Sequence, residues 1–140
     1  TMVCMILDPQ TGELECVNAG HPPAMVFAPD GTGRALQSSM HLPLGIEPTE
    51  FTTQEDVIEP GYTLAMYSDG LTEIMDNDRN LIGIEGINHF LSKFIAAKLN
   101  EGTEAISQSL LDALDGYSSN LLPSDDRSCL LAHWKGSEIS

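Results

Sequence analysis

Residues 62–73 read YTLAMYSDGLTE, an apolar run that leads directly into an aspartate and a glycine. The run from Tyr62 to Ser68 has apolar residues at positions of both parities, which predicts a central strand buried on both faces. Asp69 follows at once, and Gly70 comes next. A carboxylate at the end of a buried strand is costly unless a partner neutralises it. The sequence therefore indicates a functional site at this strand end.

A second acidic pair, Asp125-Asp126, comes shortly before another apolar run, Cys129 to Trp134, which predicts the last strand. Two carboxylate sites at strand ends could share one divalent cation, and aspartate suits Mg²⁺ or Mn²⁺ because these hard ions prefer oxygen ligands. Gly70 leaves no side chain beside such an ion. We expect the carboxylates of Asp69 and Asp125 to converge on one cleft.

The same residues also allow a plainer interpretation. Asp-Gly after a strand is a common turn, and Asp-Asp in a loop usually caps a helix or faces water. The metal-site interpretation predicts hydrolytic chemistry, because two metal ions that bridge a water would lower the pKa of that water and clamp a phosphoryl oxygen. The turn interpretation predicts no chemistry at these residues.

Strands are predicted early in the chain and helices late, which favours an α+β fold in one domain. Residues 2–19 have the pattern of a hairpin, 24–28 and 51–58 of single strands, and 76–80 of a polar turn. Two helical faces follow, with Gly102-Thr103 as the stop and cap between them. Their apolar residues are Ile84, Ile87, Leu91, Phe94 and Ile95, then Ile106, Leu110, Leu111, Leu114 and Tyr117.

The composition excludes several classes of partner. The 140 residues include 6 basic and 21 acidic side chains, giving a net charge of −15. Such a chain repels nucleic acid and anionic membranes, and no apolar stretch approaches the roughly 20 residues of a membrane span. It also repels phosphoproteins unless a bound metal supplies positive charge.

Three sparse cysteines, Cys4, Cys16 and Cys129, are expected to be reduced thiols in a cytoplasmic protein.

Five segments in order carry a more specific signal: NAGHPP at 18–23, HLPLGI at 41–46, YSDGLTE at 67–73, LIG at 81–83 and DDRS at 125–128. This series resembles the stage II sporulation protein E-like branch of the bacterial PPM-type (protein phosphatase 2C-like) serine/threonine phosphatases. The resemblance spans essentially the whole chain. It implies an α/β/β/α layered sandwich and hydrolysis of phosphoserine or phosphothreonine that depends on Mn²⁺ or Mg²⁺.

The resemblance also implies roles for particular residues. Asp69 and Asp125 match metal-binding aspartates of the family, while Gly70 and Asp126 support them. Ser68 stands where the family more often has threonine. The usual substrate in this branch is a phosphorylated anti-anti-sigma (STAS) protein in a partner-switching circuit that regulates a sigma factor. An upstream sensor or receiver domain in the same chain is common. The resemblance assigns no substrate-binding residue.

One part of the family pattern has no match. The family carries another metal-binding aspartate, and a glycine whose carbonyl coordinates, in an N-terminal Gly-Asp motif that no segment here fits. We therefore expect residues 1–140 to be a partial phosphatase domain, incomplete at the N-terminus, that alone is weak or inactive and able to form a homodimer. The alternative is a non-catalytic, phosphatase-like interaction module that binds a regulatory partner.

Overall fold

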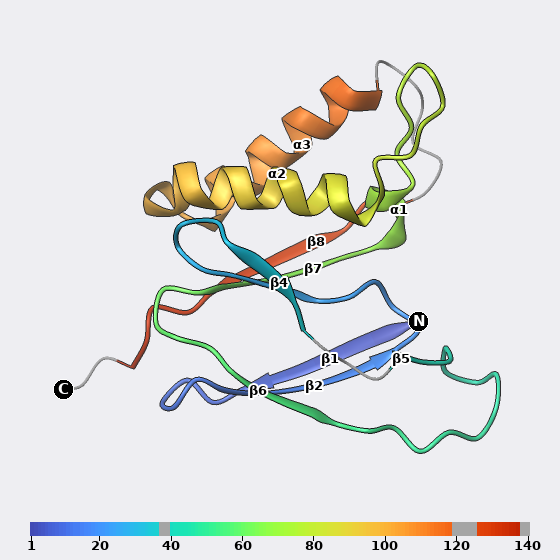
Figure 1. Cartoon of the computed structure of the whole chain (residues 1–140), viewed down its shortest axis with the longest axis vertical. Coiled ribbons are helices and arrows are strands. Elements are labelled where there is room, and N and C mark those ends of the chain that lie inside the picture. The colour runs from blue at the N-terminus through green and yellow to red at the C-terminus, as the bar shows by residue number, and fades with distance from the viewer. Residues whose placement is uncertain (37–39, 119–125, 138–140) are drawn as a thin grey trace.

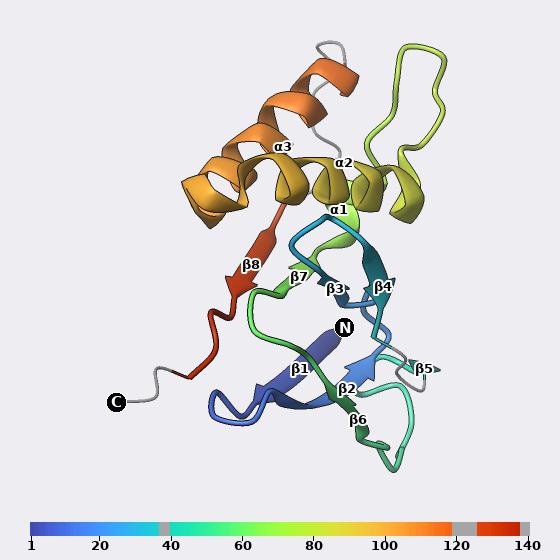
Figure 2. The ribbon, with the colours of Figure 1, turned by 60° about the vertical axis from the view of Figure 1, so that its left-hand side comes forward.

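The computed structural model describes residues 1–36, 40–118 and 126–137, and it contains two β-sheets stacked beneath a layer of helices (Figure 1). We call the sheet farther from the helices sheet A and the sheet beneath the helices sheet B. Turning the molecule keeps the same order of layers: helices, sheet B, sheet A (Figure 2).

Sheet A is built around the predicted hairpin. β1 (Met2–Leu7) pairs antiparallel with β2 (Glu13–Ala19), and Leu7 lies opposite Leu14. The other edge of β2 pairs antiparallel with β6 (Gln54–Val57) and parallel with β5 (Met40–His41). The hairpin prediction is confirmed, and β6 is shorter than the predicted strand 51–58.

Sheet B contains the strand that leads into Asp69. Its order is β4-β3-β7-β8, with all neighbours antiparallel. These strands are β3 (Met25–Phe27), β4 (Gly33–Ala35), β7 (Thr63–Tyr67) and β8 (Cys129–His133). As predicted from its apolar residues on both faces, β7 has a neighbour on each side and one core above and one below.

Two long helices cover the outer face of sheet B, and a short one follows β7. The short helix is α1 (Asp69–Thr72); the long ones are α2 (Gly83–Lys98) and α3 (Thr103–Ser118), joined by the 3₁₀ turn η1 (Leu99–Glu101). Each long helix buries apolar residues at a spacing of four, because every fourth residue returns to the same helical face. The buried residues are Ile87, Leu91 and Ile95 in α2 and Ile106, Leu110 and Leu114 in α3.

Two apolar cores separate the three layers. One lies between the helices and sheet B, and includes Phe27, Tyr67 and Leu91. The other lies between the sheets and includes Leu14, Val26 and Leu64. The α+β class and the layered sandwich are thus confirmed. Along the described ranges no helix lies against the outer face of sheet A (Figure 1).

Some elements differ from the sequence-based expectation. β4 and β5 were not predicted, because β4 is exposed along its length and β5 is only two residues long. The turn expected at Asp69-Gly70 is the start of α1. Ile84 and Leu111, which were expected on the buried helical faces, are exposed. The polar turn at 76–80 is confirmed, and the backbone amides of Asp78 and Asn80 both donate to Oδ1 of Asp76.

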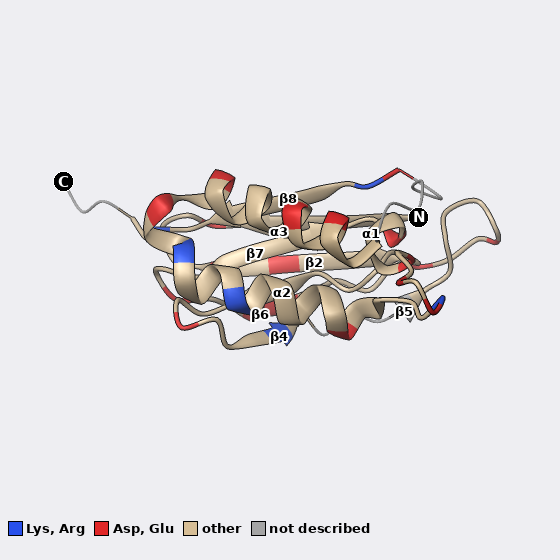
Figure 3. Cartoon of the chain, turned by 90° about the horizontal axis from the view of Figure 1, so that it is seen from above, with Lys and Arg blue, Asp and Glu red and all other residues tan. Residues whose placement is uncertain are grey.

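Acidic residues are distributed over helices, strands and loops, and basic residues are few (Figure 3). Among the described residues, no helix is long and apolar enough to cross a membrane.

An ion pair joins the edges of the two sheets. Arg34 of β4 donates to both carboxylate oxygens of Asp56 in β6, at 2.5 Å and 2.8 Å. These hydrogen bonds hold the pKa of the Asp56 carboxyl below its ordinary value. The side chain of Arg34 is 47% exposed and that of Asp56 26%, so solvent screens the pair and its contribution to stability is modest.

We expect Arg34→Met to lower the free energy of unfolding by about 0.5–1 kcal/mol at pH 7. A carboxyl whose pKa is lower in the folded state contributes stability above its unfolded pKa, about 3.9, and loses it as the pH falls through the folded value. The difference between wild type and variant should therefore shrink in acid. Urea titrations of Arg34→Met, Asp56→Asn and the double variant measure the coupling. Strictly additive effects would contradict the pair.

The three cysteines are free thiols, as predicted. Cys4 is exposed, Cys16 is buried, and burial raises the pKa of the Cys129 thiol to about 11. At pH 8 a thiol with that pKa is ionised in about one molecule in a thousand, and the thiolate is the reactive form. We expect iodoacetamide to label Cys4 in the folded protein and the other two cysteines only after unfolding, as read by mass spectrometry. Labelling of Cys129 at the rate of Cys4 would contradict this burial.

Candidate metal centre

Asp69 is the first residue of α1 and directly follows the junction from β7. Its Oδ1 accepts a hydrogen bond from the Gly70 amide at 3.1 Å, and its carbonyl accepts one from the Thr72 hydroxyl at 2.9 Å. The side chain of Asp69 is exposed, whereas Gly70 is buried. The sequence argument that burial would force a neutralising partner on this carboxylate is therefore wrong, because the chain turns outward after Tyr67.

The pairing of β7 with β8 brings the second acidic segment to the same end of sheet B. Tyr67, the last residue of β7, lies opposite Cys129, the first residue of β8. Because the strands are antiparallel, the residues after Tyr67 and those before Cys129 leave the sheet side by side. Asp126 is exposed and described, while Asp125 lies outside the described residues.

The expected convergence of Asp69 and Asp125 on one cleft therefore stays a prediction. Over residues 1–36, 40–118 and 126–137, no three His, Cys, Asp or Glu side chains gather closely enough to hold a metal ion. The described part offers two exposed carboxylates, Asp69 and Asp126, at one sheet end. Their oxygens are of the type that Mg²⁺ and Mn²⁺ prefer.

The groups beneath this sheet end are neutral. Burial raises the pKa of the Tyr67 phenol to about 12, and its hydroxyl donates to Oδ1 of Asn88 at 3.0 Å. Burial likewise keeps the Cys129 thiol protonated. Neither group supplies a nucleophile at neutral pH, because the charged form is the reactive one. The exposed carboxylates of Asp69 and Asp126 lie at the same sheet end.

An open cleft of about 490 Å³ runs between the sheets at this end. Thr1 and His21 line it from the side of sheet A, and Ser68 and Ser128 from sheet B. The Thr1 hydroxyl lies 3.2 Å from Nδ1 of His21. The polar rim of the cleft thus adjoins the segments that carry Asp69 and Asp126.

Two hydrogen bonds from one side chain hold the turn that carries His21. Asn18 is buried, and its side chain both accepts from the His21 amide at 2.8 Å and donates to the His21 carbonyl at 2.9 Å. Gly20 has φ +70°, and a Cβ there would lie 2.6 Å from the Pro43 ring. Sequence reasoning did not single out Asn18, although it begins the matched segment.

Ser68 was quoted in the sequence motif without a role. Its hydroxyl donates to the Asp126 carbonyl at 3.0 Å and accepts from the Ser128 amide at 3.0 Å. These bonds connect residues about sixty positions apart, so the register of β7 against β8 had to be known before they could be inferred.

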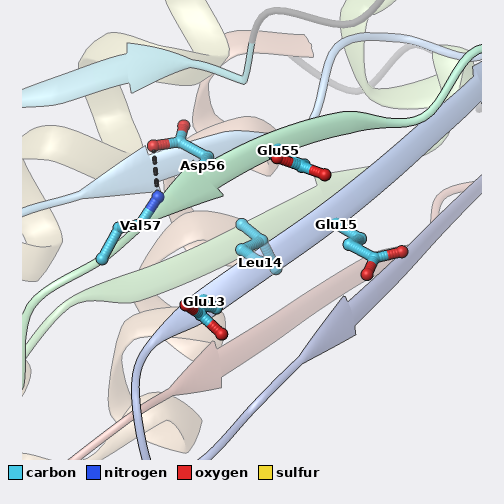
Figure 4. Close-up of a pocket in the computed structure, with 6 residues that line it drawn as sticks. All are labelled: Glu13, Leu14, Glu15, Glu55, Asp56 and Val57. Atoms are coloured by element: carbon cyan, nitrogen blue, oxygen red, sulfur yellow. Dashed lines mark hydrogen bonds between the residues drawn. The ribbon is translucent and has the colours of Figure 1, made fainter.

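A second hollow, about 330 Å³, lies on sheet A (Figure 4). Glu13 and Glu15 of β2 and Glu55 of β6 line it, and Glu15 lies directly opposite Glu55. Carboxylates directly opposed across a sheet repel one another. These glutamates do not form a three-ligand group. Their distribution over neighbouring strands is that of a solvated acidic face.

The sequence of the chain was compared with those of known protein families. Residues 1–135 match the family described as stage II sporulation protein E (SpoIIE). The chain belongs to the SpoIIE family. The match includes β1 through β8, so the whole described fold lies within it.

A curated relative is Protein IcfG of Synechocystis sp. (strain ATCC 27184 / PCC 6803 / Kazusa), 29% identical over 117 residues, which are 83% of this chain and 18% of that protein. The fold is similar to that of the RsbU and RsbW domains of Rv1364c from Mycobacterium tuberculosis, with TM-score 0.71, 24% identity, and coverage of 94% of this chain and 35% of that one. It is also similar to the Mn-presoaked phosphatase domain of SpoIIE from Bacillus subtilis, with TM-score 0.71, 15% identity, and coverage of 100% and 59%. The chain thus spans less than two thirds of each of these proteins.

Proposed function

We propose that this chain is part of a metal-dependent protein serine/threonine phosphatase domain. Asp69 and Asp125 ligate Mn²⁺ or Mg²⁺, and Gly70 and Asp126 support them. The substrate class is a phosphorylated anti-anti-sigma (STAS) protein in a cytoplasmic partner-switching circuit. The parent protein carries a sensor or receiver domain upstream, and residues 1–140 are a partial phosphatase domain.

The observation that carries the proposal is the pairing of Tyr67 with Cys129. It brings Asp69, which follows Ser68 after β7, and Asp126, which precedes β8, to one end of sheet B. Membership of the SpoIIE family and a fold shared with a SpoIIE phosphatase domain support the same assignment.

The donor set fits a hard divalent ion, because the exposed carboxylates of Asp69 and Asp126 offer oxygen ligands. When bound, such ions supply a water of lowered pKa and a clamp for the phosphoryl oxygens. This chain holds its carboxylates at the sheet end and keeps Tyr67 and Cys129 neutral beneath them. With a net charge of −15, it also needs a local cation to attract a phosphoprotein.

The second candidate is a non-catalytic, phosphatase-like module that binds a regulatory partner. It is favoured by one observation, that the outer face of sheet A exposes Met2, Ile6 and Val57. The two functions differ in a simple assay. Mn²⁺-dependent release of phosphate from a phosphoserine peptide by the full-length protein supports the enzyme, and its absence with partner binding retained supports the module.

We predict that residues 1–140 alone hydrolyse phosphoserine peptide at least about 100-fold more slowly than the full-length protein. A two-metal site needs more carboxylates than the two placed here, and each metal contributes several kcal/mol to the reaction.

The outer face of sheet A exposes Met2, Ile6 and Val57, so we expect the isolated chain to self-associate, with a homodimer as the simplest form.

Turnover and mass are measured together on the same preparation. A monomeric chain with the activity of the full-length protein would contradict both halves of this prediction.

A further inference from the structure

Ser68 lies between the last residue of β7 and Asp69, the first residue of α1. Its backbone amide donates to the Ser128 carbonyl at 2.9 Å, which extends the contact between β7 and β8 one residue past Tyr67 and Cys129. Its hydroxyl adds two bonds, one to the Asp126 carbonyl and one from the Ser128 amide, both 3.0 Å. One residue therefore makes three hydrogen bonds to the segment 126–128.

The direction of this hydroxyl is unusual for its position. Ser68 is the N-cap residue of α1, where a serine hydroxyl ordinarily accepts from the first free amides of the helix. Here the Ser68 side chain makes no capping bond. It contacts Asp126 and Ser128 instead, in the segment that precedes β8.

The segment that these bonds hold has no helix or strand of its own at residues 126–128. Within this segment, Arg127 forms an ion pair with Oδ1 of Asp115 in α3 at 3.4 Å. Because Ser68 directly precedes Asp69, the bonds of its hydroxyl hold this segment next to Asp69. That hydroxyl, together with the Ser68 amide, therefore holds Asp126 near Asp69.

We propose that Ser68 is a positioning residue, which sets the separation between Asp69 and Asp126 and thereby the affinity for the divalent ion; this rests on the proposed function. Groups that orient metal ligands without touching the metal typically change affinity by about 10–100-fold when removed.

The test uses the full-length protein with Ser68→Ala, Ser68→Thr and Ser109→Ala. Ser109 is a matched control, because its hydroxyl also donates to a backbone carbonyl, that of Ala105 at 2.8 Å, but within α3. Mn²⁺ binding is titrated by the EPR signal of free Mn²⁺, and exchange of the Ser128 amide is followed by hydrogen–deuterium exchange. We expect Ser68→Ala to raise the Mn²⁺ dissociation constant roughly tenfold and to speed that exchange. Ser68→Thr keeps the hydroxyl and should behave as wild type, as should Ser109→Ala.

Ser68→Cys gives a second measurement if the alanine variant fails to fold, because a thiol has nearly the same shape but is a weak hydrogen-bond partner. It should also weaken Mn²⁺ binding. Wild-type affinity in Ser68→Ala or Ser68→Cys, or a loss in Ser68→Thr equal to that in Ser68→Ala, would overturn the positioning role alone. Absence of Mn²⁺ binding by the wild-type protein would overturn the proposed function and this inference with it.

Discussion

Asp69→Asn in the full-length protein is expected to lower Mn²⁺-dependent phosphate release from a phosphoserine peptide by at least about 100-fold. A metal ion contributes several kcal/mol to such a reaction, and each 1.36 kcal/mol is a factor of ten in rate. The asparagine keeps the size of the side chain and can still accept from the Gly70 amide, but it removes the negative charge. Because Asp69 is exposed, the unfolding transition should barely change.

Asp112→Asn is the matched control for this variant. Asp112 is exposed on α3, and its Oδ1 accepts from the side-chain amide of Gln108 at 2.9 Å, a bond that asparagine preserves. Activity of the control should equal that of wild type. If Asp69→Asn retained activity within about threefold at limiting Mn²⁺, Asp69 would not be a metal ligand.

Leu91→Ala is expected to lower the free energy of unfolding by about 3 kcal/mol. Leu91 is 0% exposed in the core between α2 and sheet B, so the substitution removes buried methyl groups and leaves a cavity. That is a large part of the roughly 5–15 kcal/mol that stabilises a typical domain. Urea denaturation measures it as a shift of the midpoint at constant slope.

Leu111→Ala provides the comparison, since Leu111 is a helical leucine that is 45% exposed on α3. Its effect should stay within about 0.5 kcal/mol. Equal losses for the two variants would mean that the helical layer does not pack on sheet B as described.

Much of the fold could be predicted because its central elements have strong sequence patterns. The run ending at Tyr67 has apolar residues on both faces, and the structure buries it between two cores. The hairpin and the two long helices follow equally clear periods. β4 could not be predicted in this way, since Arg34 and its neighbours are exposed and the strand is held through backbone pairing with β3.

The chain positions of the candidate ligands could be read from the sequence, but their arrangement in space could not. A strand followed by Asp69, and an acidic pair before another strand, indicated strand ends. The position of Asp69 and Asp126 at the same end of sheet B follows from the antiparallel pairing of β7 with β8, which the sequence does not show. The exposure of Asp69 and the Ser68 bonds depend on the turn into α1, for which four helical residues gave no periodic signal.

We propose that one end of sheet B binds a divalent ion between Asp69 and the acidic segment before β8. Anomalous diffraction at the manganese edge, from crystals of the full-length protein or its complete phosphatase domain soaked in Mn²⁺, tests it most directly. We predict a manganese peak within coordination distance of the carboxylates of Asp69 and Asp125. A peak bound elsewhere, or carboxylates of Asp69 and Asp125 that point to opposite sides of the domain, would contradict it.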